Sequence, residues 1–187
     1  MPAHPMIRPR PGVLEIEPYV GGDSTAPGAN RVIKLSSNEN PLGPSTRAFD
    51  AYIDAARGLA RYPDGGHGAL RQAIAEVHGI EAERIVCGAG SDEIIALLCK
   101  AYAGPGDEVL HSAHGFLMYR LSALAAGATP VSAPERDLTA DVEALIARLS
   151  ERTRLVFIAN PNNPTGTMVE TAELERLAAA LPPGAML

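Results

Sequence analysis

Residues 160–167 have the sequence N-P-N-N-P-T-G-T and follow a short apolar run, L-V-F-I-A, at residues 155–159. Such a β-rich run, bounded by turn residues, is typical of a buried strand in a parallel sheet. Ligands of open α/β sheets bind beyond the carboxyl ends of the strands, so we expect this loop at a ligand crevice. Two prolines stiffen the loop and Gly166 permits a tight turn, which would hold the Asn163 amide rigidly. By residue type alone, an ordinary turn between a strand and a helix is the simpler interpretation.

A second glycine-rich stretch, R-I-V-C-G-A-G-S-D-E at residues 84–93, predicts a strand, a turn and a helix start. Free N–H groups and the positive dipole end make a helix start suitable for a phosphate group, while Ser91 as a plain N-cap is the simpler alternative. A dinucleotide fingerprint fails, because Glu93 stands where its third glycine belongs and Glu108 begins the next strand instead of ending it. No G-x-x-x-x-G-K-S/T motif is present, which excludes a P-loop.

The rest of the chain after residue 45 alternates between helical and strand patterns. This alternation predicts a doubly wound α/β sheet. Helices are expected at 45–56, 69–77, 116–124, 140–149 and 171–181, and strands at 108–111, 129–133 and 155–159, with a further strand beginning at 185.

The composition of the chain argues against several classes of binding partner. The formal net charge of −6 argues against nucleic acid and anionic membranes. No apolar run is long enough to span a membrane and no secretory leader is evident. Cys87 and Cys99 lie in apolar contexts without C-x-x-C spacing, which favours reduced thiols in the cytoplasm. His111 and His114 lack a third metal ligand, so no metal site is expected.

Several ordered motifs resemble the class I/II aminotransferases, which belong to the fold-type I group of pyridoxal 5'-phosphate (PLP) enzymes. They are N-E-N-P-L-G at 38–43, R-Y-P-D at 61–64, the turn at 88–92 and the loop at 160–167, whose P-N-N-P-T-G is similar to the histidinol-phosphate aminotransferase branch. The resemblance implies an incomplete three-layer α/β/α large domain with a mostly parallel sheet. Residues 1–45 would be an extended N-terminal arm with part of the small domain, and residues 46–187 a partial PLP-binding large domain.

The same resemblance assigns cofactor-binding roles to four residues. The backbone N–H groups of Ser91 and Asp92 would hold the PLP phosphate. Phe116, which otherwise is a core aromatic, would stack on the pyridine ring. Asn163 would donate a hydrogen bond to the phenolic oxygen of PLP.

Two tyrosines, each otherwise explained as a turn residue, gain roles from the resemblance. Tyr62 would reach across a homodimer to the PLP phosphate of the partner subunit. Tyr19 would close over an amino-acid-like phosphate substrate.

The lysine that such an enzyme needs for its Schiff base has no counterpart here, because neither Lys34 nor Lys100 has the S-x-x-K context. That lysine would lie beyond residue 187, so we expect a truncated chain, corresponding to roughly the first half of a family member and inactive by itself. The parent enzyme would interconvert histidinol phosphate and 2-oxoglutarate with imidazole-acetol phosphate and glutamate. An aromatic-amino-acid aminotransferase, a threonine-phosphate decarboxylase, or a non-catalytic α/β domain that binds a phosphate ligand or a partner are the alternatives.

Overall fold

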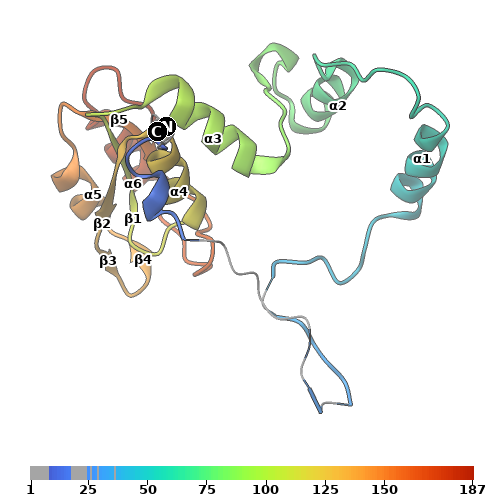
Figure 1. Cartoon of the computed structure of the whole chain (residues 1–187), viewed down its shortest axis with the longest axis horizontal. Coiled ribbons are helices and arrows are strands. Elements are labelled where there is room, and N and C mark those ends of the chain that lie inside the picture. Colours follow the sequence, from blue (N-terminus) through green and yellow to red (C-terminus); the bar gives the residue numbers. More distant parts are fainter. Residues whose placement is uncertain (1–8, 18–24, 26, 29, 36) are drawn as a thin grey trace, which may run out of the picture. The chain divides into compact units, whose positions relative to one another are not determined.

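The computed structural model of the chain describes residues 9–17, 25, 27–28, 30–35 and 37–187. Tyr19 lies outside these residues. Contacts divide the chain into two compact units, the described part of Met1–Glu17 with Cys87–Leu187, and the described part of Pro18–Val86. Figure 1 traces both units along the chain. Within the described residues, no helix is both long and apolar enough to cross a bilayer.

The first unit is built on a three-stranded parallel sheet. Its strands are β1 (Glu108–Ser112), β2 (Thr129–Ala133) and β5 (Thr153–Phe157), in the order β2-β1-β5. All residues of the central strand β1 are buried, as the apolar sequence predicts for a strand covered on both faces. Met186 forms a parallel bridge with Leu155, which confirms that a further strand begins near residue 185.

Helices cover both faces of this sheet, which gives the expected three-layer α/β/α arrangement (Figure 1). On one face, Val109 and Leu155 pack with residues of α3 (Gly90–Tyr102) and α4 (Leu117–Ala126). On the other, Leu110 and Val156 pack with α5 (Val142–Arg148) and α6 (Thr171–Ala179). Neighbouring strand residues therefore serve opposite cores, because successive side chains point to opposite faces.

The ends of these helices follow their local chemistry. Asp141 caps α5, since its carboxylate accepts hydrogen bonds from the backbone N–H groups of Glu143 and Ala144. Gly127 ends α4 in the left-handed conformation, with φ 81°, which glycine adopts without steric cost. Arg10, just before the short helix η1 (Val13–Glu15), donates a hydrogen bond to the Ala125 carbonyl at the same helix end.

The largest differences from the sequence prediction concern the start of β5 and the strand expected near residues 84–87. β5 begins at Thr153, two residues early, because Thr153 already pairs with Glu108 while its polar neighbourhood hides the strand from an apolar pattern. The strand expected near residues 84–87 is absent from the sheet of the described residues. Ile85 has an extended backbone, but without a pairing partner an extended segment gains no ladder of hydrogen bonds.

A small hairpin, β3 (Glu135–Arg136) and β4 (Thr139–Ala140), follows β2 and was not predicted. Its two turn residues, Asp137 and Leu138, have φ angles of 48° and 61°. Two positive φ angles are typical of a type I′ hairpin turn, which usually carries Asn-Gly or Asp-Gly. The Asp-Leu pair gives no such signal.

The second unit contains α1 (Thr46–Ala56), α2 (Gly68–His78) and the short helix η2 (Ala82–Arg84). Ser45 caps α1 by accepting a hydrogen bond from the Ala48 N–H. Gly79 ends α2 with φ 65°. α1 buries no residue and exposes apolar side chains, namely Phe49, Tyr52 and Ile53.

A buried carboxylate ties the amino ends of β1 and β5 together. Glu108 is 7% exposed and accepts hydrogen bonds from the Ser150 hydroxyl (2.6 Å) and from Nε of Arg152 (2.9 Å). The Ser150 hydrogen bond lowers the pKa of Glu108 and burial opposes it, but with the Arg152 guanidinium the net pKa lies below the ordinary value of 4.5.

Replacing Glu108 with glutamine is expected to lower the free energy of unfolding of this chain by about 1–3 kcal/mol at pH 7, because charged hydrogen bonds are lost. A depressed pKa stabilises the fold above the unfolded value of 4.5 and loses that effect as pH falls through the lower folded value. The variant should therefore depend less on pH in that acid range. Urea denaturation at several pH values measures this, with the exposed Glu151→Gln as the control. Identical acid dependence in both variants would contradict the assignment.

Candidate functional site

The candidate site is the carboxyl edge of the sheet, where the chain leaves β1 and β5 toward opposite faces. After β1 it enters α4 on one face, and after β5 it enters α6 on the other. Adjacent parallel strands whose connections diverge in this way leave a crevice between their carboxyl ends, which is where ligands bind in open α/β sheets. Phe116 lies on the first of these two loops and Asn163 on the second.

Hydrogen bonds brace the loop that follows β5. The Asn160 side chain both donates to the Val169 carbonyl (3.0 Å) and accepts from the Val169 N–H (2.9 Å). Asn162 is buried, and its backbone pairs with Thr167 and Gly166 at 2.8 Å each. The Asn160–Pro161 and Asn163–Pro164 peptide bonds are both cis. The hydrogen bonds of Asn160 and Asn162 thus tie the start of the loop to its end.

A direct contact joins the two loops. Nδ2 of Asn162 donates a hydrogen bond to the His114 carbonyl at 3.1 Å, across 48 residues of sequence. His114 precedes Phe116 by two residues and Asn162 precedes Asn163 by one. Phe116 and Asn163 are both half-buried, so each side chain keeps a surface open to a ligand.

Aromatic rings gather at this edge of the sheet. Phe116 packs edge-on against Tyr119, with ring centroids 5.9 Å apart and planes at 88°. Tyr119 stacks on Phe157, the last residue of β5, at 4.9 Å and 4°. His111 of β1 lies 6.5 Å from the same Tyr119 ring. These contacts fix the orientation of the Phe116 ring.

Burial keeps these rings uncharged. The pKa of His111 is lowered chiefly by burial, and the nearby Arg120 lowers it further, while the Ser112 carbonyl opposes the shift. Burial also raises the pKa of the Tyr119 hydroxyl. An apolar, neutral ring surface at this edge of the sheet is therefore maintained around neutral pH.

The start of α3 supplies free backbone donors. Gly90 has φ 73°, and the Glu93 carboxylate accepts a hydrogen bond from the Ala89 N–H at 2.7 Å, which holds the turn in place. Among the described residues, no chain acceptor meets the N–H groups of Ser91 and Asp92. The first N–H groups of a helix have no intrahelical partner and favour an anion.

The structure brings some of the predicted residues together and leaves others apart. The loops of Phe116 and Asn163 meet, but no hydrogen bond among the residues that the structure describes joins either loop to Ser91 or Asp92. Figure 1 shows the first turn of α3 extending beyond the sheet. Tyr62 lies in the second unit, where its side chain is 98% exposed.

The turn that presents Tyr62 is held by Asp64. Its carboxylate accepts hydrogen bonds from the N–H groups of Gly66 (2.9 Å) and Gly68 (2.8 Å). The pKa of Asp64 is lowered, first by the Gly68 and then by the Gly66 hydrogen bond. Asp64 therefore fixes the turn that follows Tyr62 in the chain.

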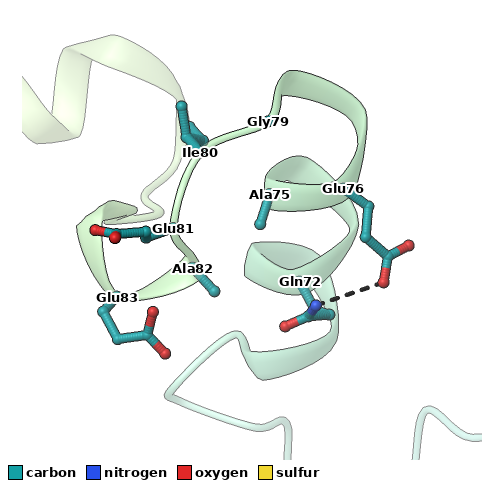
Figure 2. Close-up of a pocket in the computed structure, with 8 residues that line it drawn as sticks. All are labelled: Gln72, Ala75, Glu76, Gly79, Ile80, Glu81, Ala82 and Glu83. Carbon is teal, nitrogen blue, oxygen red and sulfur yellow. Dashed lines mark hydrogen bonds between the residues drawn. The ribbon is translucent and has the colours of Figure 1, made fainter.

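A separate hollow of about 600 Å³ lies between α2 and η2 in the second unit (Figure 2). Gln72 and Glu76, which are hydrogen-bonded to each other, lie on its helix side, and Glu81 and Glu83 on the other. None of its lining residues is a predicted site residue. Its acidic rim would repel a phosphate ligand, so this hollow is not a candidate for the site.

Sequence reasoning missed three residues that hold the edge together, namely His114, Glu135 and Asn162. His114 was considered only as a metal ligand, and Asn162 only as part of a stiff loop. Glu135 follows an alanine and a proline without any motif. Only the contacts between strand ends reveal them, because their partners are far apart in sequence.

The predicted site residues carry groups that suit a flat aromatic molecule with an anionic group, although contacts among the described residues bring together only the loops of Phe116 and Asn163. Phe116 offers a ring packed edge-on against Tyr119, and Asn163 offers an amide on a braced loop. Ser91 and Asp92 offer two backbone donors that have no acceptor in the described ranges. Each donor type matches one part of such a ligand.

The chain is similar in sequence to known proteins of one family. Residues 30–185 match the family model described as aminotransferase class I and II. The chain is 62% identical to a histidinol-phosphate aminotransferase from Dinoroseobacter shibae, over 97% of this chain and 50% of the relative. A relative of the same name from Paracoccus denitrificans is also 62% identical, over 94% and 48%.

Solved structures show the same fold. Histidinol-phosphate aminotransferase from Sinorhizobium meliloti, in complex with pyridoxal-5'-phosphate, matches with a TM-score of 0.76 and 28% identity, over 80% of this chain and 41% of that one. N-succinyldiaminopimelate aminotransferase from Mycobacterium tuberculosis matches with a TM-score of 0.65 and 32% identity, over 73% and 39%. The chain spans about half the length of the curated relatives it matches.

Proposed function

The chain belongs to the aminotransferase class I and II family, and we propose that it forms part of a PLP-dependent histidinol-phosphate aminotransferase of histidine biosynthesis. The observation that carries this proposal is the 62% identity, over 97% of the chain, to a relative of that name. The reaction would transfer the amino group of histidinol phosphate to 2-oxoglutarate, giving imidazole-acetol phosphate and glutamate.

PLP, when bound, supplies an electron sink for the negative charge that develops at the substrate carbon. In our proposal, the residues of this chain bind and orient it. Phe116 presents its ring to one face of the pyridine, and the fixed angle of that ring against Tyr119 supports this role. Asn163 donates its amide N–H to the phenolic oxygen, and the braced loop supports the precision this needs.

The N–H groups of Ser91 and Asp92 would hold the phosphate. Two observations support this, namely the lack of an acceptor for either group within the described part of the chain and the turn locked by Glu93. The Asp92 carboxylate would have to point away from the phosphate. Lys100, near the end of the same helix, remains an exposed surface lysine in this proposal.

A homodimer forms part of the proposal. Tyr62 would contact the PLP phosphate of the partner subunit, and its 98% exposure on a turn held by Asp64 supports a role outside its own unit. Tyr19 would contact the substrate. We also propose a cytoplasmic location, supported by two free cysteines, of which Cys99 is fully buried.

The test uses what we call the completed protein. This is the chain continued from its own gene or, where the gene offers no continuation, joined at residue 187 to the unmatched half of the D. shibae relative. We expect PLP-dependent glutamate formation from histidinol phosphate and 2-oxoglutarate, with kcat/KM at least about tenfold above that for phenylalanine, a difference of about 1.4 kcal/mol.

Two other amino-acid substrates distinguish the alternative functions of the completed protein. Faster transfer from phenylalanine would identify an aromatic-amino-acid aminotransferase, and release of carbon dioxide from phosphothreonine a decarboxylase. A folded completed protein that neither binds PLP nor transfers an amino group from any of these donors would overturn the proposed function. The unmodified D. shibae relative is the reference for assay conditions.

A further inference from the structure

Glu135 holds the loop after β1 with both of its carboxylate oxygens. Oε1 accepts a hydrogen bond from the His114 backbone N–H, and Oε2 pairs with Nδ1 of the same residue, each at 2.8 Å. The Glu135 side chain is only 3% exposed, whereas that of His114 is 57% exposed. An ionised carboxylate only accepts hydrogen bonds, so the proton of the His114 ring lies on Nδ1.

Further hydrogen bonds continue from His114 into a closed circuit. Its carbonyl accepts from Asn162 (3.1 Å), and Asn162 also donates to the Thr165 hydroxyl (2.8 Å). The hydroxyls of Thr165 and Thr167 are 2.8 Å apart. Thr167 donates to the Leu138 carbonyl (2.8 Å) in the hairpin turn, from which the chain returns to Glu135.

The hairpin turn that closes this circuit has a backbone conformation that is unfavourable for leucine. Leu138 has φ 61°, a region that costs a residue with a Cβ about 1–2 kcal/mol. Backbone strain of this kind persists where the surrounding contacts over-determine it, and it gathers at functional sites. The circuit joins the segments that follow β1, β2 and β5, and it passes within two residues of both Phe116 and Asn163.

We propose that Glu135 is a positioning residue of the proposed cofactor site, which sets the two loops at the separation that Phe116 and Asn163 need to engage one ligand. This inference rests on the proposed function. Glu135 itself touches neither ring nor phosphate in it and acts through His114. The hairpin β3–β4 then supports the site. Its Glu135 side chain holds the loop after β1, and its Leu138 carbonyl holds the loop after β5.

Charge contributes to the strength of this support. Burial raises the pKa of Glu135, but the hydrogen bonds from the N–H and ring of His114 and from the Ser112 hydroxyl outweigh it, so the pKa lies below its ordinary value. The side chain is therefore ionised around neutral pH, with two strong acceptor oxygens. Glutamine would offer one acceptor oxygen to these three donors.

The test measures the dissociation constant of PLP for the completed protein by spectrophotometric titration. Glu135→Gln should raise that constant about tenfold or more, which is the size of effect seen when residues that orient metal ligands are lost. Asp141→Asn is the matched control, because Asp141 is also a hydrogen-bonded carboxylate beside the hairpin but binds Arg136 and the start of α5 instead of His114. It should change the constant less than threefold.

A double-mutant cycle separates positioning from a general loss of stability. In the Phe116→Ala background, Glu135→Gln should weaken PLP binding less than threefold, because the ring it positions is gone. Hydrogen exchange of the His114 amide in the PLP-free protein should quicken at least tenfold in Glu135→Gln. Thr167→Val removes the hydroxyl that bonds Thr165 and the Leu138 carbonyl, so it breaks the circuit at a point distant from Glu135. This variant should also raise the dissociation constant of PLP. If Glu135→Gln does not fold, Thr167→Val tests the proposal in its place.

The possible failures point to different conclusions. An unchanged dissociation constant in Glu135→Gln, or an equal effect with and without the Phe116 ring, would overturn this inference and leave the proposed function standing. A wild-type completed protein that does not bind PLP, or a Phe116→Ala variant that binds it unchanged, would overturn the proposed site and this inference with it.

Discussion

Replacing Asn163 with alanine is expected to lower kcat/KM of the completed protein by about 10²–10³-fold, with little change in stability. The expected size is that of removing one precisely placed donor from a catalytic centre. Asn163 is half-buried on a loop whose hydrogen bonds are made by its neighbours Asn160 and Asn162. The loss of the Asn163 side chain should therefore leave the loop intact. Steady-state kinetics with histidinol phosphate and 2-oxoglutarate measure the effect.

The matched control for that variant is Asn160→Ala. Asn160 bonds the Val169 backbone with both its side-chain atoms, so its loss should lower the melting temperature more than Asn163→Ala does. A fall of kcat/KM by less than threefold in Asn163→Ala would contradict the assigned role.

The second large effect is expected in the core. Replacing Leu145 with alanine should lower the free energy of unfolding of the completed protein by about 3–5 kcal/mol, the upper part of the range for a buried leucine. Leu145 is fully buried in the cluster that joins α5 and α6 to Leu110 and Val156 of the sheet. Because close packing there leaves little room for relaxation, the cavity should persist.

Urea denaturation measures this loss. Leu97→Ala is the control, since Leu97 of α3 is 48% exposed, and it should cost less than about 1 kcal/mol. An equal cost for the two variants would show that the face covered by α5 and α6 is not the stabilising core.

The parallel sheet could be predicted because its strands are apolar and lie between helical patterns. β2 has the predicted bounds, 129–133, and β1 and the helices differ from theirs by a few residues. The strand predicted near residues 84–87 was wrong. Strand formation depends on a neighbouring strand to pair with, which the local sequence does not specify. The type I′ turn at Asp137 and Leu138 lacked the glycine that would have signalled it.

At the candidate site, a strand end followed by a proline-rich loop drew attention to Asn163, although residue type alone favoured an ordinary turn. A family resemblance was needed to predict its role and those of Phe116, Ser91, Asp92, Tyr62 and Tyr19. The circuit through His114, Glu135 and Asn162 could not be predicted. Its hydrogen bonds join residues 21 and 48 positions apart, and no spacing rule covers contacts made by the ends of separate strands.

The central claim is that one ligand pocket unites Ser91, Phe116 and Asn163, and a crystal structure of the completed protein with PLP tests it most directly. We expect phosphate oxygens about 2.7–3.2 Å from the backbone nitrogens of Ser91 and Asp92, the pyridine ring stacked on Phe116, and the Asn163 amide on the phenolic oxygen. PLP bound away from Phe116 and Asn163, or its phosphate held without the start of α3, would contradict the claim.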